Sequence, residues 1–175
     1  MSKTLLDITV LCVGTGYTAN DFNPDIYKCV LNYQKNPNDS SETYCFLKGS
    51  VDVELDGGAI PCDEVTLVDA TMRCTHSGTN DIKAPFHVAV SFLKTYGLKG
   101  SPLKNSFLLE AGLNNDQTRS LSAPIKFVTN SIGVPKKWSI DIQQLQHLGD
   151  LGSQQLSGND CIVLNLKFEV NVERI

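Results

Sequence analysis

The C-terminal stretch Asp160–Ile175 alternates strictly between apolar and mostly polar positions. Side chains of a β-strand point alternately to its two faces, so this period places one face on a core and the other in water. A helix would distribute the same apolar side chains around its whole circumference. We therefore expect a half-buried strand that ties this end of the chain into a sheet. Its inward positions are predicted to be Ile162, Leu164, Leu166, Phe168, Val170 and Val172.

Short segments of similar character recur along the rest of the chain, separated by Gly, Pro, Asn and Asp. In Val65–His76 the alternation predicts that Val68, Ala70, Met72 and Cys74 face the core. Including the C-terminal stretch, about nine or ten strands are expected at a spacing typical of β-sandwiches and jelly rolls. The predicted strands are Leu5–Val13, Ile26–Tyr33, Thr43–Lys48, Ser50–Leu55, Val65–His76, Phe86–Phe92, Ser106–Glu110, Ala123–Val128 and Asp160–Ile175.

One segment, Ile140–Leu148, is a helix candidate. Ile142, Leu145 and Leu148 are three residues apart on one helical face, and a serine and a glycine flank the segment as candidate caps. Trp138–Ile142 also alternates with the period of a strand, so a strand is the alternative at this position. At most one short helix is therefore expected.

These patterns predict an all-β protein, an antiparallel β-sandwich of the jelly-roll or immunoglobulin-like kind, with one domain over residues 1–175. Leu5–Val13 and Asp160–Ile175 are the first and last long strands. We expect them to be neighbours near the centre of one sheet. Their pairing would bring the two termini close together.

Charge and hydropathy exclude several classes of partner. The net charge is −4, and no Lys/Arg cluster is denser than Lys136–Lys137. Release of counterions from phosphates drives most nucleic-acid affinity, so no nucleic acid or anionic membrane surface is expected as a partner. Apolar residues are 41% and charged residues 19% of the chain, as in an ordinary globular protein, and no stretch approaches a membrane span.

The N-terminal residues contain no apolar run of the length of a signal peptide, because Asp7 interrupts them. We therefore expect a cytoplasmic location, with later release or packaging left open. Six cysteines are present with irregular spacing and no Cys-x-x-Cys. In a reducing compartment they are expected to be free thiols that serve as small buried apolar residues.

No cofactor is expected, although one motif resembles a cofactor site. Gly14-Thr-Gly16-Tyr-Thr-Ala19 fits G-x-G-x-x-A, in which glycines let the backbone approach a pyrophosphate at the start of a helix. Pro24 would interrupt that helix, because it lacks an N–H group and clashes with the preceding turn. The motif is therefore interpreted as a loop.

A weak metal-site hypothesis concerns Asp52, Glu54, Asp56 and Asp63. Oxygen ligands at alternate positions followed by a glycine resemble the opening of a calcium loop. Glu54 stands where Asp or Asn is usual, and no flanking helices are predicted. The alternative is the solvated face of a strand whose Val51, Val53 and Leu55 turn inward.

Acid–base chemistry near neutral pH would depend on the histidines. His76 continues the predicted inward register of Cys74, and His87 lies opposite Phe86 and Val88 among small neighbours. A hydrolase or transferase using His76, His87 and a cysteine is therefore one hypothesis. No G-x-S-x-G, H-E-x-x-H or P-loop motif is present, so we expect that the protein is not an enzyme.

Ligand binding is predicted at aromatic, amide and carboxylate side chains in and near polar loops. One of these loops lies in the polar stretch Leu113–Ser120, which is expected to be exposed. An exposed Trp or Tyr can stack on a sugar ring or anchor a protein partner. For Trp138 the alternative is a core position. The candidate residues are Trp138, Tyr17, Tyr96, Asn114, Asn115 and Asp116.

Three functional hypotheses follow from the sequence. The first is a non-enzymatic structural subunit that assembles with copies of itself, as a component of a virion, tube or inclusion. The second is a carbohydrate-binding, lectin-like module, and the third is the hydrolase or transferase described above. A β-sandwich can host all three, so the fold alone does not distinguish them.

Overall fold

The computed structural model describes residues 2–17, 26–35, 45–75, 86–92, 105–109, 118–121, 123–127, 133–144, 156 and 160–172. Every regular element in these ranges is a β-strand, so the all-β prediction is confirmed. No helix of a length and apolarity that would cross a membrane occurs among the described residues. The strands are β1 (Ser2–Val13), β2 (Tyr27–Val30), β3 (Asn32–Lys35), β4 (Cys45–Glu54), β5 (Cys62–Thr75), β6 (Phe86–Ser91), β7 (Asn105–Leu109), β8 (Thr118–Ser120), β9 (Ile125–Phe127), β10 (Lys137–Gln144) and β11 (Cys161–Val172).

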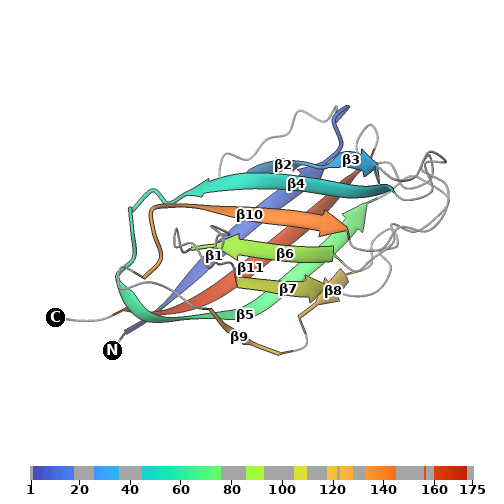
Figure 1. Ribbon diagram of the computed structural model, residues 1–175. Helices are drawn as coiled ribbons and strands as arrows, with labels where there is room; N and C mark the ends of the chain where they lie inside the picture. Colours follow the sequence, from blue (N-terminus) through green and yellow to red (C-terminus); the bar gives the residue numbers. More distant parts are fainter. Residues whose placement is uncertain are drawn as a thin grey trace, which may run out of the picture.

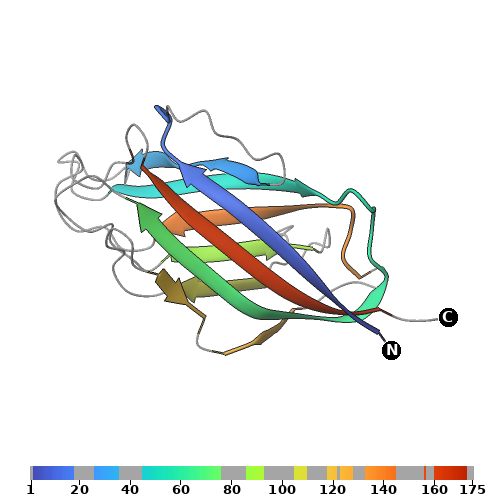
Figure 2. The ribbon, with the colours of Figure 1, turned by 180° about the vertical axis from the view of Figure 1, so that it is seen from behind.

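The strands form two sheets that pack face to face (Figures 1 and 2). The six-stranded sheet has the order β2-β1-β11-β5-β8, with β9 also pairing to β5, and the five-stranded sheet has the order β3-β4-β10-β6-β7. In both views the strands of one sheet cross those of the other at an angle, as twisted sheets do when their faces pack. The buried apolar side chains form one cluster between them.

The pairing follows the nested scheme of a jelly roll. The first strand pairs with the last (β1 with β11), β4 pairs with β10, β5 pairs with β8 and β9, and β6 pairs with β7. All of these pairs are antiparallel, so the predicted antiparallel sandwich is confirmed and its topology is the jelly roll. Only β2, which runs parallel to β1, departs from this direction among the described pairs.

The predicted neighbours β1 and β11 are paired along their whole length, from Ser2 opposite Val172 to Val13 opposite Cys161. They lie at the centre of the six-stranded sheet. The start of β1 and the end of β11 therefore meet at one end of the sandwich, as expected.

The inward face of β11 is the centre of the core. Its apolar positions from Ile162 to Val170 have no exposed surface, which confirms the alternation read from the sequence. The Phe168 ring lies 5.6 Å from the Phe92 ring, 5.4 Å from that of Phe127 and 6.1 Å from that of Trp138, between ring centroids. These tilted and edge-to-face contacts join side chains of both sheets into one aromatic cluster.

The predicted helix at Ile140–Leu148 is wrong over its described part, because Lys137–Gln144 is strand β10. Trp138, Ile140 and Ile142 point into the core, and β10 is hydrogen-bonded between β4 and β6. A central strand satisfies its backbone groups on both sides and buries one face. This gain outweighs the weak three-residue spacing that favoured a helix.

The prediction that Val68 faces the core is also wrong. Asp69 pairs with Lys167, but the next pair joins Leu67 to Phe168, so Val68 has no partner on β11. This β-bulge inserts one residue into β5, so a different set of side chains faces inward on the N-terminal side of the bulge. Val65 and Leu67 are fully buried in place of Val68.

Two strand boundaries also differ from the prediction. Thr43–Lys48 and Ser50–Leu55 were expected as separate strands, but β4 runs continuously through Gly49. Ile26–Tyr33 was expected as one strand, but the chain leaves the first sheet after β2 and enters the second as β3. Leu31 lies at the crossing, buried, with its N–H donating to the Val13 carbonyl at 2.8 Å.

The polar stretch Leu113–Ser120 was expected to be exposed, and its described end is strand β8. In β8, Ser120 is exposed, and residues 118–120 pair with Thr71–Arg73 of β5. The prediction missed the strand because three residues are too few for a periodic pattern.

Candidate functional site

The outer face of the five-stranded sheet brings polar side chains from three strands into one patch. Gln143 of β10 pairs with Lys48 of β4 on one side and with His87 of β6 on the other. Two residues earlier on β10, Asp141 pairs with Ala89 of β6. Since every second residue of a strand shares a face, these side chains lie in two adjacent rows.

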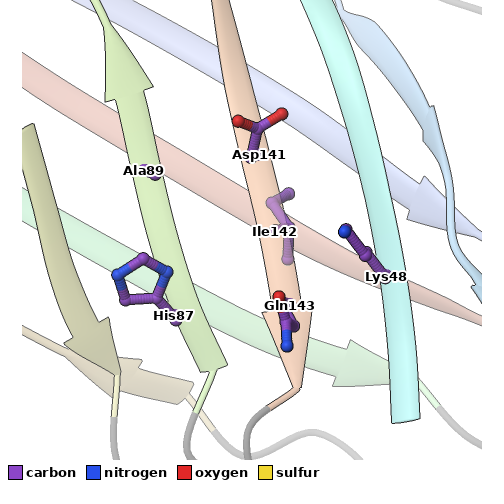
Figure 3. A pocket seen from close by; sticks show the side chains of 6 residues that line it. All are labelled: Lys48, His87, Ala89, Asp141, Ile142 and Gln143. Atoms are coloured by element: carbon purple, nitrogen blue, oxygen red, sulfur yellow. The ribbon is translucent and has the colours of Figure 1, made fainter. Parts of the chain in front are cut away.

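A depression with a volume of about 370 Å³ opens over this patch. Ala89 pairs with Asp141 on the outer face and is only 3% exposed. Figure 3 shows Lys48 and His87 on opposite sides of β10, with Asp141 and Gln143 along it. The described lining residues are Lys48, His87, Ala89, Asp141, Ile142 and Gln143, of which Ile142 turns its side chain to the core.

The depression offers hydrogen-bonding groups of both kinds. Lys48 donates from an ammonium group, Asp141 accepts at a carboxylate, and the Gln143 amide does both. The ring nitrogens of His87 can also donate or accept a hydrogen bond. No thiol or hydroxyl group is among the described lining side chains. The arrangement therefore suits recognition of a polar ligand.

The outer face of the six-stranded sheet is different in character. There the Asn165 amide of β11 donates to Asp7 Oδ1 at 2.6 Å and to Thr9 Oγ1 at 2.9 Å, both on β1. Lys3 of β1 forms a 3.1 Å ion pair with Glu169 of β11. These contacts link the two central strands to each other, so they are interpreted as structural.

Trp138, predicted as a weak ligand-binding residue, is a core residue in the structure. Its side chain is 4% exposed and meets the Phe92 ring edge-to-face at 4.9 Å. The indole N–H is buried without a hydrogen-bond partner in the described structure. Trp138 therefore presents no exposed ring on which a sugar could stack.

Of the five other residues predicted to bind a ligand, the structure describes only Tyr17. Tyr17 is half-buried, and the Lys28 ammonium lies 5.6 Å from the centre of its ring. Tyr96, Asn114, Asn115 and Asp116 lie outside the described residues. Tyr17 therefore follows β1 and is a partly accessible aromatic ring beside Lys28 of β2, and it is not among the described residues that line the depression.

The acidic residues of the calcium hypothesis lie on and after β4. Asp52, Glu54 and Asp56 are exposed, and Glu54 accepts an ion pair from Lys136 at 3.7 Å. Asp63 lies in β5, and its side chain is outside the described part. No group of three or more His, Cys, Asp or Glu side chains placed for a metal ion occurs among the described residues. The three described side chains fit the alternative, a solvated strand face.

The histidine–cysteine hypothesis is only partly accessible to the structure, because His76 lies outside the described residues. His87 is on the outer face of the five-stranded sheet, as its alternation predicted. Cys74 is fully buried on the inner face of the six-stranded sheet. The core therefore separates His87 from Cys74, and the predicted pairing of Cys74 with His76 lies outside the described residues.

Two cysteines meet inside the sandwich. Cys12 of β1 is opposite Cys29 of the parallel strand β2, and both are fully buried as free thiols. A hydrogen bond to Cys29, together with burial, raises the pKa of the Cys12 thiol, while the same bond lowers the pKa of Cys29. Both side chains belong to the buried apolar cluster between the sheets.

The sequence analysis singled out only His87 among the residues of the depression. Lys48 and His87 belong to strands far apart in the chain from each other and from Asp141 and Gln143 of β10, so no local motif joins the set. The sequence indicated a depression here only through Ala89 and Ser91, the two outward residues that follow His87 on its strand. Both are small and leave space beside the imidazole.

Comparison of the sequence with known proteins gives no family assignment. No protein-family model matches the chain, and no curated protein matches it. Its architecture and the chemistry of its surface are therefore the basis for a functional proposal.

Proposed function

We propose that this protein is a structural subunit that assembles with copies of itself through the edge strand β7, as a component of a virion, tube or inclusion. The jelly-roll architecture supports the proposal only by analogy, because viral capsid and lectin domains both use it. The observation that carries the proposal is the composition of the sheet edges.

An open sheet edge presents unpaired backbone groups that can pair with another chain. Proteins that remain monomeric usually protect such edges with charged side chains, proline or bulges. The described edge strands β2, β3, β8 and β9 each contain a basic residue, Lys28, Lys35, Arg119 and Lys126 respectively. Strand β7, Asn105–Leu109, contains no charged residue and no proline, and among the described strands it pairs only with β6.

The side chains of β7 are also suited to contact with a second copy. Phe107 and Leu109 are buried in the core and hold the strand in place. Leu108, on the outer face, is 43% exposed. If two copies pair β7 antiparallel about a two-fold axis, the backbone bonds extend the sheet and the two Leu108 side chains lie near each other.

The test compares the wild-type protein with Leu108→Lys. A lysine at this position places a charge at the edge of both copies, so it should disfavour pairing and leave the core intact. We expect the wild type to be an oligomer by light scattering after gel filtration and L108K to have a smaller mass. Far-UV circular dichroism should be the same for both.

The matched control is Leu5→Lys. Leu5 is 60% exposed on β1 of the other sheet, beside the charged residues Lys3 and Asp7. This variant makes the same change in side chain away from β7 and should keep the wild-type mass. A monomeric wild type, or an L108K variant that keeps the full oligomer, would contradict the proposal.

A further inference from the structure

We propose that the depression over Ala89 binds a small polyhydroxy carboxylate, of the chemical class of the acidic monosaccharides. The depression adjoins the β7 edge, because His87 pairs with Leu108, but its lining residues lie on β4, β6 and β10 and the inference does not depend on self-assembly. It rests on the shape of the depression and on the order of its charged groups.

The shape fits a ligand of monosaccharide size. The volume of about 370 Å³ lies near the lower end of the range of roughly 300–1,000 Å³ that is usual for small-molecule sites. Ala89 forms the floor, with Asp141 beside it on β10. The methyl group offers a small apolar contact, and the surrounding groups are polar, as a hydroxyl-rich ligand requires.

One end of the depression is suited to an anion. Lys48 and His87 flank Gln143 in one cross-strand row, so their backbones are two strand spacings, roughly 10 Å, apart. Figure 3 shows the two side chains facing the same side of the sheet across β10. A carboxylate between them can accept hydrogen bonds from the ammonium group, the imidazole and the Gln143 amide.

The other end is suited to hydroxyl groups. Asp141 is one outward position along β10 from Gln143, at a distance of roughly 7 Å along the strand. Its carboxylate accepts hydrogen bonds from neighbouring hydroxyls, and the Gln143 amide can both donate to and accept from them. Asp141 would repel a bare inorganic anion, whereas a neutral sugar would leave the cationic end of the site without its match. A ligand with both parts satisfies both ends of the depression.

The experiment uses saturation-transfer difference NMR on the wild-type protein with sodium D-glucuronate as the probe, because this method works at any assembly size. We expect saturable transfer with a Kd of roughly 1 mM. D-glucose and sodium acetate, which each carry half of the recognised groups, should bind at least about tenfold more weakly.

Variants locate the site. Lys48→Ala and Asp141→Asn should each weaken glucuronate binding by at least about tenfold. Lys137→Ala is the matched control, since it removes an exposed lysine from the same face of β10 outside the depression, and it should leave binding unchanged. Absence of saturable transfer would overturn the proposal, as would equal binding of glucose or acetate, or an equal effect of K137A and K48A.

Discussion

At the scale of single residues, the core contains one aromatic cluster that joins the two sheets. Phe168 comes from the central strand of the six-stranded sheet, and Trp138 comes from the central strand of the other. Phe92 lies between them, 5.6 Å and 4.9 Å from their rings. Aromatic rings bury large areas and prefer such tilted contacts, so this cluster fixes how the sheets face each other.

Phe168→Ala should therefore be strongly destabilising. Removing a fully buried phenylalanine typically costs about 3–5 kcal/mol, which is a large part of the stability of a domain. Lys167→Ala is the control on the next residue, where the side chain faces out and the cost should stay near 0.5 kcal/mol. Thermal melts of the two variants measure the difference. Small shifts of equal size would show that β11 is peripheral to the fold.

At the scale of elements, the crossing from β2 to β3 joins the two sheets along one edge of the sandwich. The chain changes sheets at Leu31, and β4 runs below the crossing with Gly49 facing it. A Cβ atom at Gly49 would contact the carbonyl oxygen of Val30 and lie 2.9 Å from Cys29 Sγ. The glycine is required here because it lets two backbones approach each other closely.

Gly49→Ala should consequently lower the free energy of unfolding by about 1–3 kcal/mol, since the backbone at Val30 must move to make room. Gly57→Ala is the matched control, because a Cβ atom there has no neighbour within 4 Å. Its effect should stay within about 0.5 kcal/mol. Urea unfolding of both variants is the measurement. A G49A variant as stable as G57A would show that the crossing has room for a side chain.

At the scale of the whole molecule, the jelly-roll pairing joins the two ends of the chain in the middle of one sheet. No disulfide closes this arrangement among the described cysteine side chains, which are Cys12, Cys29, Cys62, Cys74 and Cys161. The sandwich is held by its buried apolar faces and its strand pairing. A chain of this length can bury enough surface for that.

All six cysteines should consequently react as thiols in denaturant under non-reducing conditions. In the native protein the fully buried Cys12, Cys29 and Cys74 should react slowly. Cys161 is partly accessible, but burial raises its pKa, so at neutral pH less of it is thiolate and its exchange with a disulfide reagent should speed up as the pH rises. Thiol counting with an aromatic disulfide reagent tests this, and two or more missing thiols in denaturant would contradict it.

The sequence by itself determined the features that depend on local alternation. The inward face of β11, the outward position of His87 and the all-β class were predictable, because side-chain direction in a strand follows the order of residues alone. The predicted neighbours β1 and β11 followed from their length and position.

Only the tertiary structure decided the features that depend on pairing between distant segments. Residues 137–144 form a strand because β4 and β6 supply hydrogen-bond partners on both sides. Val68 turns away from the core because β5 has one more residue than β11 at the bulge. The depression arose in the same way, since Lys48, Gln143 and His87 become neighbours only through strand register. Local patterns specify which face a residue occupies, but register specifies which residues share it.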